Sequence, residues 1–192
     1  MTQNQEFALQ IQQQLTEAVK VLRAGGVIAY PTEYCFGLGC DPRNQASVER
    51  LLQIKQRAAT QGVILIAADL TQIEDYAELD ALTRLAEIQA SWPGPNTWLL
   101  PTKANVPTWV RGKHTTIAMR IPGHTLSRAL CREFGHAIVS TSANRHGQPA
   151  LLTTEGVVAE LGDELDLVVD APVGGSASAS TIRDAISGQI LR

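Results

Sequence analysis

The sequence contains few cysteines and no long apolar run. Three cysteines (Cys35, Cys40 and Cys131) occur among its 192 residues and form no C-x-x-C pair, so we predict that they are packing residues in a reducing compartment. Apolar runs such as residues 63–68 are far shorter than the roughly 20 residues that span a bilayer, and residues 2–6 are polar, unlike a secretory signal. We therefore expect a cytoplasmic protein that does not associate with membranes.

Several common signatures of functional sites are also missing. The sequence has no G-x-x-x-x-G-K-[ST] loop and no G-x-S-x-G elbow, and Gly37-Leu38-Gly39 lacks the third glycine of a dinucleotide fingerprint. The four histidines share no metal-ligand spacing with the cysteines. A hydrolase triad and a metal site built from protein ligands are therefore not expected.

The composition is that of a globular protein, with 44% apolar and 18% charged residues, and we expect one domain spanning residues 1–192. The net charge is -3, but it is unevenly distributed. Residues 103–145 carry seven basic side chains and one acidic side chain, Glu133. This segment is the expected place for an anionic ligand. Its basic residues are Lys103, Arg111, Lys113, Arg120, Arg128, Arg132 and Arg145.

Apolar spacing predicts helices and short strands in alternation. Helices are expected at residues 6–24, 48–55, 82–92 and 125–134. Strands are expected at residues 27–30, 63–68, 97–100, 116–121, 137–141 and 166–170, with a closing hairpin around Ser187-Gly188. Because strands follow one another closely after Trp92, a purely parallel sheet is not expected. The predicted fold class is α/β, a single domain with a twisted mixed sheet and flanking helices.

The first polar pattern is Lys55-Gln56-Arg57, where a helix runs out into a loop. An ammonium and a guanidinium at this spacing can converge on one polyanion such as a phosphate chain. The alternative is a solvated helix end that the macrodipole favours.

The second pattern, residues 140–144, directly follows the apolar Ala137-Ile138-Val139. In a strand, Ser140, Ser142 and Asn144 point to the same side, at an end where α/β sheets commonly bind ligands. The alternative is ordinary turn chemistry.

The third pattern is residues 31–39. Thr32 and Glu33 can orient a small polar molecule, and the two glycines allow close backbone approach, although an ordinary strand-to-loop transition also fits. Arg120, in an apolar strand, needs an anionic partner, which is either a carboxylate ligand or an internal glutamate.

Six motifs, taken together and in order, resemble the YrdC family of threonylcarbamoyl-AMP synthases, and the short bacterial members most closely. They are P-T-E-x-x-F-G-L-G, K-x-R, W-P-G-P-x-T, R-I-P, S-T-S-A-N and S-T-I-R-D, spread between Val27 and Arg192. The resemblance implies that L-threonine, bicarbonate or CO2, and ATP form threonylcarbamoyl-adenylate and pyrophosphate. The adenylate then serves, through a downstream threonylcarbamoyl transferase machinery, the t6A modification of tRNA.

The resemblance also implies roles for particular residues. Lys55 and Arg57 are the expected catalytic residues, because positioning and charge neutralisation are the main requirements of the reaction. The expected nucleotide-binding residues are Lys55, Arg57, Ser140, Ser142, Asn144 and Arg183. The expected threonine-binding residues are Thr32, Arg120 and Ser180. We expect Mg2+ to accompany ATP, bound chiefly by phosphates and water.

The sequence departs from the family pattern at five positions. Ala58 and Gln61 replace a common proline and lysine after K-x-R, which removes one expected phosphate contact. Ile66 stands near a frequent histidine, and Tyr34 and Phe36 replace a threonine and a tyrosine of the substrate loop. These differences affect the pocket more than the class of reaction.

The main alternative is an RNA-binding module acting in ribosome or rRNA maturation, with the basic segment 103–145 contacting RNA, including tRNA. Against it, that segment holds only two aromatic residues, Trp109 and Phe134, whereas single-stranded RNA recognition usually uses several. A third alternative is carbamoyl transfer within a larger maturation enzyme, which the absence of an appended zinc-finger region in this sequence disfavours.

Overall fold

The computed structural model describes residues 2–80 and 82–192. Its α-helices are α1 (Gln3–Arg23), α2 (Gln45–Ile54), α3 (Leu70–Glu74), α4 (Leu85–Ala90), α5 (Thr108–Arg111), α6 (Thr125–Phe134) and α7 (Thr154–Leu161), with 3-10 turns η1 (Ala59–Gln61) and η2 (Gly162–Glu164). Its strands are β1 (Ile28–Pro31), β2 (Phe36–Gly39), β3 (Ile64–Ile66), β4 (Asn96–Pro101), β5 (Thr116–Arg120), β6 (Ile138–Val139), β7 (Thr141–Ser142), β8 (Leu167–Val168) and β9 (Thr181–Asp184).

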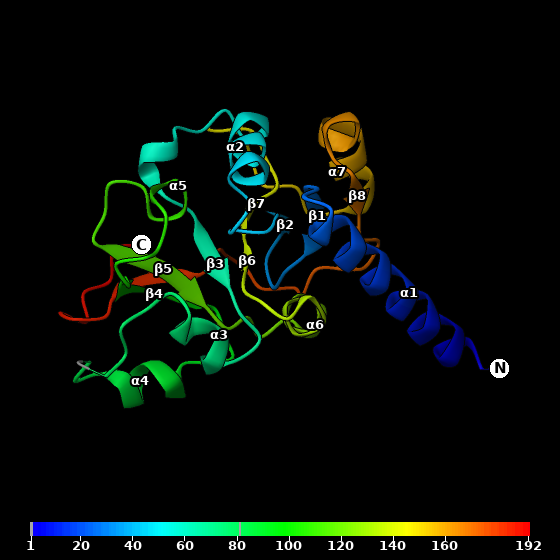
Figure 1. Cartoon of the computed structure of the whole chain (residues 1–192). Helices are drawn as coiled ribbons and strands as arrows, with labels where there is room; N and C mark the ends of the chain where they lie inside the picture. The colour runs from blue at the N-terminus through cyan, green and yellow to red at the C-terminus, as the bar shows by residue number, and fades with distance from the viewer. Residues whose placement is uncertain (1, 81) are drawn as a thin grey trace.

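The strands form two mixed sheets. The four-stranded sheet has the order β7-β2-β1-β8 and the five-stranded sheet the order β6-β3-β5-β4-β9. Helices α2 and α5 lie on one side of the second sheet and α3 and α4 on the other, while α1 and α6 lie beside the first (Figure 1). The mixed α/β class with flanking helices is thus confirmed. The division into two sheets is an addition that periodicity alone did not predict.

The chain passes from one sheet to the other at Ser140. The predicted strand 137–141 is interrupted there, because Ile138 and Val139 pair with β3 whereas Thr141 and Ser142 pair with β2. The backbone N–H of Ser140 donates to the carbonyl of Ile64 at 2.8 Å, which fixes the crossing point. A predicted site residue therefore lies at the junction of the two sheets.

The pattern at residues 31–39, which the sequence allowed to be a ligand-orienting segment or a strand-to-loop transition, contains a strand that was not predicted. Residues 36–39 form β2, which pairs antiparallel with β1, so only residues 32–35 connect the two strands. Phe36 and Leu38 are fully buried and alternate with Gly37 and Gly39, which is the period of a strand. The predicted helix 82–92 is likewise shorter, as α4, and α3, α5 and α7 were not predicted.

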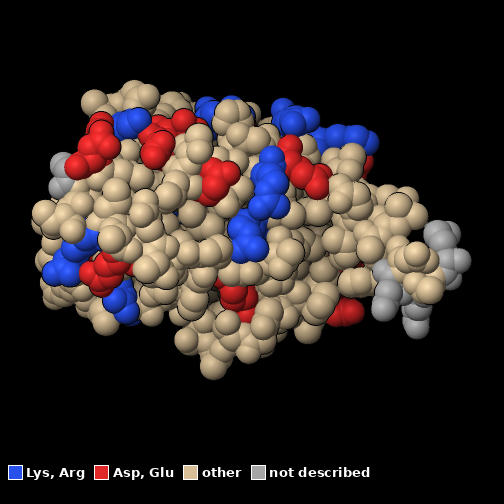
Figure 2. Space-filling model, turned by 90° about the horizontal axis from the view of Figure 1, so that it is seen from below, with Lys and Arg blue, Asp and Glu red and all other residues tan. Residues whose placement is uncertain are grey.

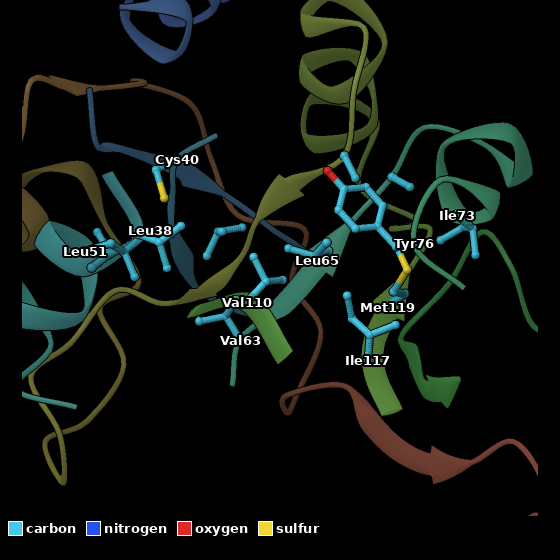
Figure 3. Packing of buried hydrophobic residues seen from close by; sticks show 14 of the residues in the cluster. Leu38, Cys40, Leu51, Val63, Leu65, Ile73, Tyr76, Val110, Ile117 and Met119 are labelled. Carbon is cyan, nitrogen blue, oxygen red and sulfur yellow. The ribbon is translucent and has the colours of Figure 1, made fainter. Parts of the chain in front are cut away.

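The main core lies between the two sheets and joins them. Leu38 of β2 and Leu51 of α2 are buried on one side, and Leu65 of β3 and Met119 of β5 on the other (Figure 3). A second cluster packs α1 and α6 against β1 and includes Leu22 and Leu130. All three cysteines are buried and unpaired, as predicted for packing residues. Among the described residues, no helix has the length and apolar character needed to cross a membrane.

Candidate active site

A polar cavity of about 160 Å³ is lined by both sheets. The first sheet contributes β2 and β7, and the second contributes Ile64 of β3 and Arg120 of β5. Six of the predicted site residues line it: Thr32, Arg57, Arg120, Ser140, Ser142 and Ser180. The structure thus gathers residues that are separated by up to about three quarters of the chain into one small volume.

Lys55 lies just outside this lining and organises it. Its side chain is buried, and its ammonium group donates to the carbonyls of Ser142 at 2.5 Å and Asn144 at 2.9 Å, and to the Oδ1 of Asn144 at 2.8 Å. Burial, followed by the charge of Arg57, lowers the pKa of Lys55 to about 8. The Ser142 hydroxyl also donates to Asn144 Oδ1, at 2.7 Å, so one lysine fixes the S-x-N segment.

Arg57 reaches the cavity because the chain turns sharply after α2. Gln56 has a positive φ of 53°, and the backbone N–H of Arg57 donates a hydrogen bond of 3.0 Å to the carbonyl of Leu52. One end of its guanidinium donates to Gly62 O at 2.9 Å, whereas its Nε is buried without a partner. Burial, followed by Arg192, lowers the pKa of Arg57. A half-buried guanidinium beside another cation is suited to an anion.

Arg192 is a cavity residue that sequence reasoning missed. The predicted closing hairpin is present: Gly188 N donates to the carbonyl of Asp184, and Ile182 N donates to the carbonyl of Arg192 at 3.0 Å. The Arg192 side chain donates to Ser180 O at 3.2 Å. The predicted hairpin could have indicated this residue, because a chain that turns back at Ser187-Gly188 brings Arg192 beside the predicted site residue Ser180.

A second cavity, of about 210 Å³, continues the first. The two share Arg57, Ile64 and Arg192, and the second adds Arg111 and His114. Their common boundary is therefore cationic. A ligand with an anionic chain can cross this boundary, with one end in each cavity.

The anionic partner of Arg120 is an internal glutamate, one of the two alternatives that the sequence allowed. Its Nη1 lies 3.4 Å from Glu33 Oε1, and both side chains are largely buried. Cys35 also lines the cavity, and burial raises the pKa of its thiol. The thiol is therefore protonated at neutral pH and is a poor nucleophile.

The connection between β1 and β2 and the segment before β9 are held by polar contacts. The Thr32 hydroxyl donates to Cys35 O at 2.7 Å, which closes the turn of residues 32–35. The Ser180 hydroxyl is 2.9 Å from that of Thr97. These contacts hold residues 32–35 and the segment around Ser180 in place, and both segments line the cavity.

Arg183 does not line either cavity. Its guanidinium lies over the ring of Trp98, 5.7 Å from the centroid, and 3.7 Å from a carboxylate oxygen of Glu87. The nucleotide-binding role that the resemblance implies for Arg183 stays a prediction.

Several basic side chains of the segment 103–145 contact the protein itself. Arg128 donates to Pro122 O, Arg145 pairs with Glu164 at 2.6 Å, and Arg111 donates to His114 O. On the face in Figure 2, Lys and Arg side chains are interspersed with Asp and Glu. This face therefore shows no continuous basic track of the kind that contact with an RNA backbone uses.

Metal ligands do not gather at the cavity. Within residues 2–80 and 82–192, no group of three or more His, Cys, Asp or Glu side chains is placed to hold a metal ion. The one carboxylate of the lining, Glu33, already contacts Arg120. These residues do not fit a metal site made by the protein alone.

Comparison with known proteins decides the family. The Sua5, YciO and YrdC family model, described as "Telomere recombination", matches residues 20–192. The chain belongs to the Sua5/YciO/YrdC family. A Xylella fastidiosa (strain 9a5c) member named threonylcarbamoyl-AMP synthase is 51% identical over 180 residues, 93% of this chain and 96% of that protein. A Vibrio cholerae (El Tor N16961) protein of the same name is 48% identical over 93% of this chain and 96% of its own length.

Solved structures of the Sua5/YciO/YrdC family share the fold. P. abyssi Sua5 complexed with L-threonine superimposes with a TM-score of 0.82 at 29% identity, covering 88% of this chain and 50% of that chain. E. coli YciO gives a TM-score of 0.82 at 26% identity, covering 94% of this chain and 89% of that chain. The resemblance drawn from the six motifs is therefore confirmed.

Proposed function

We propose that this chain is a threonylcarbamoyl-AMP synthase, which converts L-threonine, bicarbonate and ATP to threonylcarbamoyl-adenylate, pyrophosphate and water. The name of relatives about half identical over nearly the whole chain supports this activity. The observation that carries it is the gathering of Arg57, Arg120 and Ser142 around one buried polar cavity.

The first cavity suits the amino acid, and the second cavity suits the nucleotide. Arg120 is the buried cation available to the carboxylate of L-threonine, and P. abyssi Sua5, a protein of this family, has been solved in complex with L-threonine. Arg57 and Arg192, at the boundary with the second cavity, are assigned to the phosphate chain. Arg192 then supplies a phosphate contact in place of the lysine that Gln61 replaces.

The reaction needs positioning and charge neutralisation more than a covalent catalyst. The amine of threonine is carboxylated, and a carbamate oxygen then attacks the α-phosphorus while pyrophosphate leaves. Arg57 and Arg192 neutralise the charge that develops on the leaving phosphates, and Lys55 holds the Ser142–Asn144 segment against the nucleotide. Mg2+ is assigned to the substrate, as MgATP, rather than to a protein site.

The test is pyrophosphate release by purified protein with ATP and bicarbonate, with L-threonine or L-serine added. Release that depends on threonine supports the proposal. If the folded protein releases none, the activity is excluded. Contact with tRNA and transfer of the adenylate to a downstream transferase remain predictions.

A further inference from the structure

Helix α1 extends beyond the surface that the rest of the chain offers it. Its 21 residues span about 30 Å, whereas α6, which packs against it, has 10 residues. Figure 1 shows the N-terminal turns of α1 projecting past α6. Residues 5–10 are all exposed, whereas Leu15 and Leu22 are buried in the second core cluster. The first turns of α1 therefore receive little of the tertiary packing that stabilises most helices.

The apolar stripe of α1 continues into this projecting end. Phe7, Ile11 and Leu15 follow one another at a spacing of four residues, which places them on one face of the helix. Leu15 is buried, Ile11 is partly buried and Phe7 is 54% exposed, so the burial of the stripe decreases toward the N-terminus. The sequence thus extends an apolar face past the point where this chain covers it.

An open apolar groove lies beside this stripe. Its volume is about 530 Å³, which exceeds that of either polar cavity of the candidate active site. Its apolar lining comes from α1, α6 and the segment after β8, and includes Phe7, Ile11, Leu15, Leu126, Ala129 and Pro172. The groove also reaches Glu33, which lines the first polar cavity as well. The groove and the candidate active site therefore share a wall.

An exposed apolar side chain and an apolar groove on the same face are self-complementary. Phe7 lies at the rim of the groove, and a two-fold axis presents the same face of each copy to the other. We propose that this face joins two copies of the chain, with the projecting ends of their α1 helices packed antiparallel and each Phe7 in the groove of the other copy. Exposed apolar patches of this kind commonly mark protein interfaces.

The charges beside the groove favour antiparallel packing. Glu6 is the only charged residue among the first 16 of the sequence. Arg132 is exposed one turn after Ala129 of the groove lining, and the adjacent Glu133 accepts a hydrogen bond of 2.9 Å from Gln12 of its own chain. Antiparallel packing places the first turn of each α1 opposite the turns that contact α6, so each Glu6 approaches Arg132 of the other copy. Parallel packing would bring the two Glu6 carboxylates together, which is unfavourable.

Sedimentation velocity of the purified protein over a range of concentrations tests the interface. The wild-type protein should approach a mass of twice 20.7 kDa as its concentration rises. Phe7→Gln should raise the dissociation constant of the dimer at least about tenfold, because it removes the apolar side chain that enters the groove. Leu9→Gln is the matched control and should stay within about twofold, since Leu9 is 50% exposed but lies two residues on, on another face of the helix. A mass of 20.7 kDa at every concentration, or equal weakening by both variants, would overturn the proposal.

A charge exchange tests the antiparallel arrangement. Arg132→Glu should weaken dimerisation at least about threefold at low salt, because the two-fold axis repeats the contact. Glu6→Arg added to Arg132→Glu should restore the wild-type dissociation constant. No weakening by the first change, or no restoration by the second, would overturn this arrangement. Both positions are exposed, so thermal melts should show that the variants fold. These outcomes are independent of the proposed function, which threonine-dependent pyrophosphate release tests separately.

Discussion

The ammonium group of Lys55 donates a hydrogen bond of 2.8 Å to the side-chain oxygen of Asn144, 89 residues away in sequence. It also holds two backbone carbonyls of the same segment. A residue expected to touch phosphate thus uses its three donors on the protein itself. We propose that its contribution to nucleotide binding is to shape this segment and to add positive charge behind it.

Nucleotide affinity should therefore decline as the pH rises through about 8, the pKa to which burial and Arg57 lower Lys55. Above that pH the side chain loses both a donor and its charge. The measurement is ATP binding between pH 7 and 9.5 without threonine. Lys55→Met should bind more weakly and show no such decline, and an identical decline in this variant would assign the titration to another group.

Arg57→Ala should lower kcat/KM for pyrophosphate release by about a hundredfold or more, because the proposed role of its guanidinium is to neutralise the charge that develops on the phosphates. The fold should persist, since its one side-chain hydrogen bond is to Gly62 O. Arg43→Ala is the matched control, as Arg43 pairs with Asp41 away from the cavity. Turnover unchanged in Arg57→Ala would exclude the assigned role.

Arg120→Gln should raise the KM for threonine at least about tenfold and leave the KM for ATP within about twofold. It should also lower the Tm, because Glu33 then keeps a buried charge without its partner. Arg128→Gln, whose side chain donates to Pro122 O outside the cavity, is the control. An unaltered threonine dependence would leave Arg120 with a structural role only.

Two arginines near the C-terminus are expected to behave differently. Arg192→Ala should raise the KM for ATP about tenfold, since Arg192 borders both cavities beside Arg57. Arg183→Ala should mainly lower the Tm, because Arg183 covers Trp98. Steady-state kinetics and thermal melts on both variants check this. A larger effect of Arg183→Ala on the KM for ATP would favour the role that family resemblance implies.

Gly39→Ala should destabilise the protein by about 2 kcal/mol, because the new methyl group would lie 2.7 Å from the Tyr30 ring and 2.9 Å from Val139 O. Gly162→Ala is the control, since its methyl group would meet Val158 at an ordinary 3.5 Å. Urea unfolding of both variants gives the comparison. Equal free energies of unfolding would mean that Tyr30 of β1 and Val139 of β6 move away from Gly39 of β2 at little cost.

The sequence predicted the parts of the site that depend on local pattern. Ser142 and Asn144 were expected to act together, and the structure joins their side chains at 2.7 Å. Arg120 was expected to need an anion, and Glu33 provides one. These predictions worked because strand period and the cost of burying charge act over short distances or on single residues.

The missed features depend on long-range pairing. Periodicity showed strand 137–141, but only pairing partners reveal that its two halves join different sheets. No strand was predicted at residues 36–39, because two glycines obscured the burial of Phe36 and Leu38. Arg192 was overlooked because its side chain has no local pattern, and only the hairpin places it near Ser180.

The position of the cavity between two sheets has a consequence for stability. Gly37 and Ser142 belong to the first sheet, while Arg120 belongs to the second and the segment leading into β9 adjoins it. A substrate that contacts both sheets links them non-covalently, in addition to the covalent crossing of the chain at Ser140. Its binding energy therefore adds to the energy needed to pull the sheets apart, and the folded lifetime of this protein becomes tied to the supply of its own substrates.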